Sequence, residues 1–350
     1  MKKVLSIILA VILTAGCLSG CNFGGKSDRD GKLTVVATIF PEYDWVMNVL
    51  GDNPAGAKVT LLLNSGVDLH NYQPTADDIL KISTCDLFIY VGGESDGWVK
   101  DVLRNANNKN MVVINLLDVL GDAVKEEEVV EGMQEDEHDH DHEDGDDDHD
   151  HEDGDHDHED GDHDHHEHEE EPEYDEHVWL SLRNAEILTG SITDALGKLD
   201  PDHADTYKKN AEAYKGKLKE LDGLYKAAVS GANLKTVLFG DRFPFRYLTD
   251  DYGLTYYAAF VGCSAETEAN FETVIFLAKK SDELSLPAVL TIEGNDHRIA
   301  ETIIQNSNNK NRKILTMDSM QGTTAKDIKN GTTYLSVMEK NLTVLKEALN

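Results

Sequence analysis

The chain has 350 residues and a formal net charge of −35, with 67 acidic and 32 basic side chains. Residues 126–176 hold 30 of the acidic side chains and no Lys or Arg, so the rest of the chain carries only about −5. Such a mildly acidic body has no basic patch, and we expect no nucleic-acid partner. The four cysteines are too few for a disulfide framework, and their spacing does not match a zinc ribbon.

The N-terminus has the composition of a signal peptide. Two lysines precede an apolar run over residues 4–13, which is shorter than the roughly 20 residues of a membrane-spanning helix. The following Leu18-Ser19-Gly20-Cys21 resembles the lipobox of bacterial lipoproteins. We predict a signal peptide over residues 1–20, lipidation of Cys21 and a flexible tether over residues 21–31. An uncleaved anchor helix is the alternative.

Eight short runs rich in β-branched and apolar residues alternate with helix-like stretches. Four of them precede the acidic block and four follow it. Strands that alternate with helical patterns predict parallel α/β sheets, and two such sets predict two lobes. The runs are Leu33–Thr38, Val59–Leu63, Leu87–Val91, Met111–Asn115, Thr236–Phe239, Leu254–Ala259, Ala288–Ile292 and Ile314–Met317.

Residues 126–172 form a segment rich in His, Asp and Glu. The unit Asp-His-Asp-His-Glu-Asp-Gly occurs three times, starting at residues 139, 148 and 155. Because the segment cannot bury a core, we expect it to be disordered without ligand. Imidazole is a preferred ligand of zinc, nickel and copper, so we predict auxiliary metal binding rather than a mere solubilising insert. The candidate ligands are His138, His140, His142, His149, His151, His156, His158, His163, His165, His166 and His168.

A single long helix is predicted between the two sets of strands. Asp200 and Pro201 have the pattern of an N-cap followed by proline at the first helical position. An apolar stripe at three- and four-residue spacing then runs from Ala204 through Leu224 to Ala228. We expect an N-terminal lobe over residues 32–200, this linking helix over 201–229 and a C-terminal lobe over 230–350.

Three segments resemble the metal-ligand segments of the zinc and manganese solute-binding proteins of ABC importers. They are Asp68–Thr75 (DLHNYQPT), Asp175–Ser181 (DEHVWLS) and Ile314–Ser319 (ILTMDS). A histidine-rich insert before the second segment is typical of the zinc-handling members. The likeness extends from about Leu33 to the C-terminus. It implies two (β/α)4-like lobes joined by one long rigid helix, with one metal ion bound between the lobes and no enzymatic activity.

The resemblance also implies a set of metal ligands. His70 and His177 match the family's ligand positions, and Asp318 matches its carboxylate from the second lobe. Glu293 is a further candidate, because it follows a strand at the edge of the sheet where ligands bind in parallel α/β folds. Two histidines with one or two carboxylates suit zinc. They discriminate less well against manganese, which stays the alternative.

One residue departs from the family pattern. Counting back from Tyr252-Gly253-Leu254, the place where relatives put a third ligand, His or Glu, is occupied by Arg242. Arginine stays protonated and has no lone pair to offer a metal. Asp241, Glu293 or water is expected to take over that position, and Arg242 is expected to pair with Asp241, Glu293 or Asp318.

These features together predict an extracytoplasmic binding lipoprotein, anchored by lipid at the outer face of the cell membrane. We expect a monomer that captures zinc and delivers it to the permease of an ABC importer, which works with an ATPase. The alternative is a surface adhesion or metal-buffering protein that binds metal mainly through the histidine-rich segment. A metallohydrolase is disfavoured because the sequence has no His-Glu-x-x-His motif.

Overall fold

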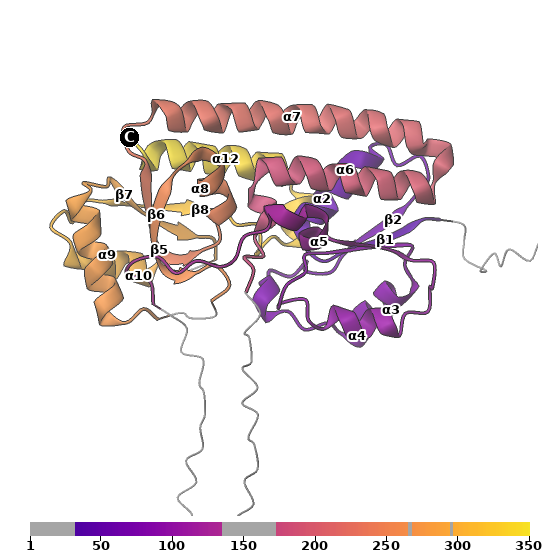
Figure 1. The fold of residues 1–350 in the computed structure, drawn as a ribbon, viewed down its shortest axis with the longest axis horizontal. Helices are drawn as coiled ribbons and strands as arrows, with labels where there is room; N and C mark the ends of the chain where they lie inside the picture. The colour runs from indigo at the N-terminus through magenta and orange to yellow at the C-terminus, as the bar shows by residue number, and fades with distance from the viewer. Residues whose placement is uncertain (1–31, 135–172, 265–267, 295–296) are drawn as a thin grey trace, which may run out of the picture. The chain divides into compact units, whose positions relative to one another are not determined.

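Two parallel four-stranded sheets form in this computed structural model, which describes residues 32–134, 173–264, 268–294 and 297–350 (Figure 1). The strand orders are β2-β1-β3-β4 and β6-β5-β7-β8. All the pairings between these strands are parallel, which confirms the predicted α/β class. The strands are β1 (Thr34–Ala37), β2 (Lys58–Leu61), β3 (Leu87–Tyr90), β4 (Val112–Asn115), β5 (Thr236–Phe243), β6 (Thr255–Val261), β7 (Ala288–Ile292) and β8 (Lys313–Met317).

Helices connect successive strands in each half of the chain. We call β1–β4 with α2–α6 the first lobe, and β5–β8 with α8–α12 the second lobe. Among the described residues, we find no helix with the length and apolar character needed to cross a bilayer. The first lobe contains α2 (Phe40–Leu50), α3 (Ala76–Thr84), α4 (Val99–Arg104), α5 (Leu116–Leu120) and α6 (Leu182–Leu199). The second contains α8 (Arg246–Tyr252), α9 (Phe271–Glu283), α10 (Arg298–Asn306), α11 (Ala325–Lys329) and α12 (Tyr334–Ala348).

Helix α7 (Ala204–Gly231) connects the lobes and has 28 residues, or roughly 42 Å at 1.5 Å per residue. It contacts α2 and α6 of the first lobe and α8 and α12 of the second (Figure 1). The predicted apolar stripe is wrong at Leu224, which is 49% exposed. The helical period of 3.6 residues carries the buried face through Tyr225 and Val229 instead.

Asp200 and Pro201 are the N-cap and first residue as predicted, but of a short turn that precedes α7 and not of α7 itself. The residues after Asp200 form a 3-10 turn, Pro201–His203, and the Asp200 side chain caps no backbone N–H there. Instead the carboxylate accepts a hydrogen bond from Tyr207 Oη at 2.6 Å and lies 2.7 Å from His203 Nδ1. Asp200 thus fixes the first turn of α7 through side chains rather than through the backbone.

A hydrophobic core continues from one lobe into the other. The ring of Trp45 on α2 packs edge-on against Tyr334 on α12, with centroids 5.4 Å apart. Trp179 donates its Nε1–H to the Ser319 carbonyl at 2.8 Å, and Tyr334 Oη donates to the Trp179 carbonyl at 2.7 Å. These three rings are fully buried, so the contacts fix one lobe against the other. A second, smaller cluster lies between the second sheet and helices α9 and α10.

The described chain continues past Glu126, where the composition placed the start of the histidine-rich segment. Glu126 forms a bridge with Tyr174, and the Gln134 N–H donates to the Ala259 carbonyl at 2.9 Å. Met133 is buried, and Val130 packs against the same core. The high acidic content of this segment led to the prediction that it begins at Glu126. The apolar side chains of Val130 and Met133 instead hold residues 126–134 against the second lobe.

Candidate metal centre

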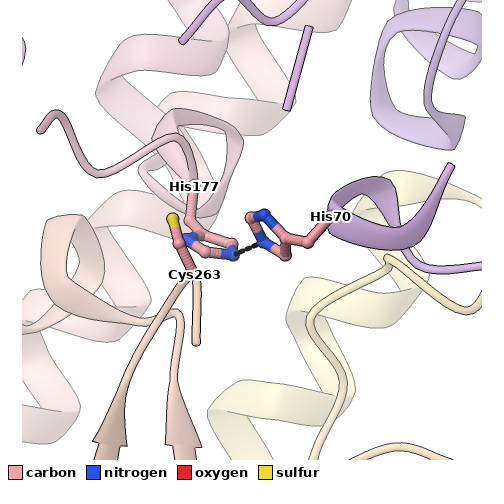
Figure 2. Close-up of side chains that lie close together, drawn as sticks. All are labelled: His70, His177 and Cys263. Atoms are coloured by element: carbon pink, nitrogen blue, oxygen red, sulfur yellow. Dashed lines mark hydrogen bonds between the residues drawn. The ribbon is translucent and has the colours of Figure 1, made fainter. Parts of the chain in front are cut away.

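The candidate centre lies where connections from both lobes meet. The loop after β2 supplies His70, the segment before the 3-10 turn Val178–Leu180 supplies His177, and the turn after β6 supplies Cys263 (Figure 2). One ligand atom from each of these three side chains lies within 4.8 Å of the other two. Loops at the carboxyl ends of parallel strands are the usual place for a ligand in this kind of fold.

His70 is fixed by the 3-10 turn Leu69–Asn71. Asp68 begins this turn, and its Oδ1 accepts the His70 N–H at 3.0 Å. The ring Nδ1 lies 2.7 Å from Ser95 Oγ, which leaves Nε2 facing His177. The side chain is only 7% exposed. Burial, followed by the nearby charge on His177, lowers the pKa of His70 to about 3, so its imidazole is neutral and can ligate.

His177 is completely buried and is oriented by Asp175. Asp175 Oδ1 accepts the His177 backbone N–H at 2.9 Å and lies 2.9 Å from the ring Nδ1. Burial opposes a charge on this ring, but the carboxylates of Asp175, Glu176 and Asp68 together outweigh it and raise the pKa of His177. A carboxylate on one ring nitrogen directs the other toward a metal, and this arrangement is common among metal-binding histidines.

The two imidazoles point their Nε2 atoms at each other across 3.2 Å (Figure 2). Two nitrogens bound to one tetrahedral zinc at 2.0–2.1 Å would be about 3.3 Å apart. In this structure the contact is a hydrogen bond between the two rings, and its length is close to the spacing of two ligands of one ion. Gln321 approaches from the second lobe, with its Nε2 at 3.2 Å from His177 Nε2.

Cys263 lies two residues beyond the end of β6, and its backbone N–H donates to Glu127 Oε1 at 3.0 Å. The preceding Gly262 packs directly on His177, since a Cβ added there would lie 3.0 Å from the imidazole ring. Burial raises the pKa of the Cys263 thiol well above its usual value, so the metal-free thiol is protonated. Cys263 forms no disulfide within the described residues.

A cavity of about 240 Å³ borders the centre. Four glutamates line this cavity, and their carboxyl groups can attract a cation. Glu176 is 2% exposed, and its Oε2 has no hydrogen-bond partner within the described structure. The lining residues are His70, Glu94, Ser95, Glu127, Glu173, Tyr174, Glu176 and Cys263.

Arg242 does not pair with Asp241, Glu293 or Asp318, so that expectation was wrong. Its Nη2 lies 2.6 Å from Asp68 Oδ2, and its Nη1 donates to the Ser264 carbonyl at 3.2 Å. The partner is an acid of the other lobe, which sequence spacing cannot reveal. Burial works against ionisation of Asp68, but Arg242 and His70, through charge and hydrogen bonds, together outweigh it and lower the Asp68 pKa. Asp241 instead accepts backbone N–H groups of Arg242 and Ile292.

The carboxylates of Glu293 and Asp318 lie apart from the histidine pair, in a second cavity of about 530 Å³ that Asp68 and Arg242 also line. Glu293 accepts hydrogen bonds from the backbone and hydroxyl of Ser319, each at 2.6 Å. Asp318 accepts the Met320 N–H at 2.8 Å. Burial raises the pKa of both carboxyls. In the described structure these two acids do not join the group of His70, His177 and Cys263.

Residues 35–348 match the family described as "Zinc-uptake complex component A periplasmic". The chain belongs to this family. It is 32% identical over 348 residues to the zinc-binding lipoprotein AdcA of Streptococcus pneumoniae R6, covering 99% of this chain and 61% of that protein. The chain thus spans about three fifths of that relative's length. It is 29% identical over 343 residues to the zinc uptake protein ZnuA of Bacillus subtilis, covering 98% of this chain and 96% of the relative.

Solved structures of the family share the fold. The Zn(II)-bound ZnuA-like domain of S. pneumoniae AdcA superposes with a TM-score of 0.65 at 28% identity, covering 91% of this chain and 99% of that one. The metal-dependent lipoprotein YcdH of B. subtilis gives 0.67 at 24% identity, covering 91% and 99%. Membership of this family places the chain outside the cytoplasm.

Cys263 was not among the site residues predicted from the sequence. The sequence did contain a signal for Cys263. This residue follows the predicted strand 254–259, and the ends of parallel strands lie at one edge of the sheet, as for Glu293 and Asp318. Its neighbours His70 and His177 come from the other lobe, and only the fold brings them near. The predicted lipidation site Cys21, the signal peptide and the eleven histidines of the segment 138–168 lie outside the described residues.

Proposed function

We propose that this protein binds one zinc ion between its lobes through His70 and His177 and delivers it to the permease of an ABC importer. The Nε2–Nε2 distance of 3.2 Å carries the proposal, because it matches the spacing of two ligands on one tetrahedral zinc. The names of the relatives AdcA and ZnuA support zinc as the ion. Two carboxylates, Asp175 and Asp68, hold the ligand turns in place.

Two imidazoles leave two positions of a tetrahedral zinc for other ligands. Asp318 and Glu293 are the carboxylates that the sequence proposes for them. Manganese prefers oxygen ligands, so the nitrogen pair supports zinc over manganese. We further propose that lipid on Cys21 anchors the monomer and that the histidine-rich segment acts as an auxiliary store of metal.

Zinc titration of a variant that lacks residues 136–170 tests the binding proposal. One tight equivalent of zinc should remain after this deletion, although the total zinc bound should fall. Replacing His70→Ala and His177→Ala together in the same background should abolish that equivalent. His203→Ala is a matched control, because this imidazole pairs with Asp200 rather than with a second histidine. Unchanged tight binding in the double variant would favour the metal-buffering alternative.

Growth under zinc limitation tests delivery. A strain that lacks the chain should need more zinc, and the wild-type gene should restore growth only when the permease and its ATPase are present. The histidine double variant should fail to restore growth at equal protein level. Rescue by that variant would show that the site between the lobes is not used for uptake.

Cys21→Ala tests the anchor. The variant should leave the membrane fraction and appear in the medium, since only Cys21 follows the Leu-Ser-Gly pattern. Persistent membrane association with Cys17 intact would contradict this assignment.

A further inference from the structure

We propose that Cys263 is the third protein ligand of the bound metal, so that the centre is a His70–His177–Cys263 set. This inference rests on the proposed function. It names the residue that would supply the third ligand, because Arg242 occupies the expected ligand position and cannot bind a metal. It starts from three ligand atoms that lie within 4.8 Å of one another and come from segments far apart in the sequence (Figure 2). A sulfur and a nitrogen bound to one tetrahedral zinc would be about 3.6 Å apart, so metal binding would draw the thiol and the imidazoles closer together.

The turn that carries Cys263 is held in place on both sides. Glu127 accepts its N–H at 3.0 Å, and Gly262 allows the turn to lie against the His177 ring. Arg242 donates to the Ser264 carbonyl at 3.2 Å and pairs with Asp68 at 2.6 Å. Asp68 in turn holds the backbone of His70. Arg242 therefore links the turn of Cys263 to the turn of His70 without being a ligand itself.

The other candidates for this position are already engaged. Asp241 accepts backbone N–H groups through both of its oxygens. Glu293 accepts hydrogen bonds from Ser319 and Gln321 in the second cavity. Cys263, by contrast, borders the acidic cavity beside His70 and forms no disulfide within the part of the chain that the structure describes. Zinc binding would replace the thiol proton, which passes to solvent, and would leave a zinc–thiolate bond.

A thiolate also sets the choice of metal. Sulfur ligands favour zinc and other soft or borderline ions, whereas manganese favours oxygen ligands. A His2Cys set leaves one position of a tetrahedral zinc free, which a water or an incoming ligand can take. The acidic cavity next to His70 and Cys263 provides the space for it.

Cobalt(II) titration of the full-length protein tests the proposal, because cobalt bound to a thiolate absorbs in the near ultraviolet and cobalt bound only to nitrogen and oxygen does not. The wild type should show this band. Cys263→Ser and Cys263→Ala should both lose it and weaken tight zinc binding about tenfold or more. Cys85→Ser, at a buried thiol elsewhere in the first lobe, should keep the band. The histidine-rich segment has no thiol and does not interfere.

Alkylation of the wild-type protein gives a test without any substitution. Zinc should protect Cys263 from iodoacetamide, as measured by mass spectrometry of its peptide, and a chelator should remove the protection. If the band is absent and both Cys263 variants keep wild-type zinc affinity, while the His70 and His177 double variant loses it, the ligand assignment is wrong and the proposed function stands. If none of these variants changes tight zinc binding, the proposed function itself is wrong.

Discussion

The two lobes contribute to the centre in different ways. The first lobe supplies both imidazoles, and a carboxylate two residues earlier in the chain, Asp68 or Asp175, holds each turn. The second lobe supplies Arg242, at the position where the family resemblance implies a third ligand, and Cys263, which was not predicted from the sequence. The half of the site that matches the family is built from local contacts. The half that departs from it depends on contacts between lobes.

The first lobe also buries several acids. Glu42 is fully buried, and its Oε2 accepts the N–H groups of Thr38 and Ile39. Burial, followed by the charge of Asp96, raises the pKa of Glu42 from 4.5 to about 8. The folded protein therefore prefers the protonated acid more strongly than the unfolded chain does. Stability from this group is complete below about pH 4.5 and is lost as the pH rises to about 8.

The largest expected effect follows from that pKa. Metal-free protein should lose unfolding free energy between pH 4.5 and 8, by up to about 1.4 kcal/mol per pH unit from Glu42. Glu42→Gln cannot ionise and should flatten this dependence. Urea unfolding at several pH values in the presence of a chelator measures it. An equally steep loss of stability in the variant would mean that another group causes it.

Asp175→Asn tests how the first lobe orients its ligands. The amide cannot hold the His177 ring as the carboxylate does, so we expect zinc binding to weaken about 10- to 100-fold. Asp200→Asn is the matched control, because Asp200 makes the same carboxylate–imidazole contact with His203 away from the centre. Equal zinc affinity in both variants would show that Asp175 does not orient His177 for metal binding.

Arg242→Ala tests the second lobe. The substitution removes the link between Asp68 and the Ser264 carbonyl, and we expect zinc affinity to fall about tenfold, or 1.4 kcal/mol. Arg183→Ala is the control, since Arg183 pairs with Asp251 across the lobes but away from the histidines. Arg242→His offers an imidazole at the relatives' ligand position. Tighter zinc binding in that variant would show that Arg242 only occupies a ligand's place.

The smallest effect is expected at Glu293 and Asp318. Glu293→Gln and Asp318→Asn should each change zinc affinity less than about threefold if Cys263 completes the site, while Glu293→Gln lowers stability through its contacts with Ser319. Calorimetric titration and thermal unfolding measure the two effects. A loss of affinity above about tenfold at either acid would place it in the ligand set, as the sequence proposed.

The eight strands and the long helix were predictable because their signals are local. Val35 and Val36 lie in one run, and Tyr207 through Leu221 follow one helical period, so each pattern can be read within a few residues. The predicted stripe went wrong at Leu224, where an apolar residue falls outside the face that the helix buries. The segments of His70 and His177 were recognisable because each resembles a short family motif, and the structure adds that Asp68 and Asp175 fix the two ligand turns.

The sequence by itself determined the fold class, and its resemblance to a known family pointed to His70 and His177 as candidate ligands. Only the tertiary structure decided that Arg242 pairs with Asp68, 174 residues away, and that Cys263 lies beside His177. The tertiary structure also places Glu293 and Asp318 outside the group of His70, His177 and Cys263. Their local sequence did not indicate this difference. The physical reason is that a coordination sphere needs atoms from both lobes within a few ångströms. Their separation depends on the packing of Trp45, Trp179 and Tyr334 between the lobes, and no local pattern encodes that packing.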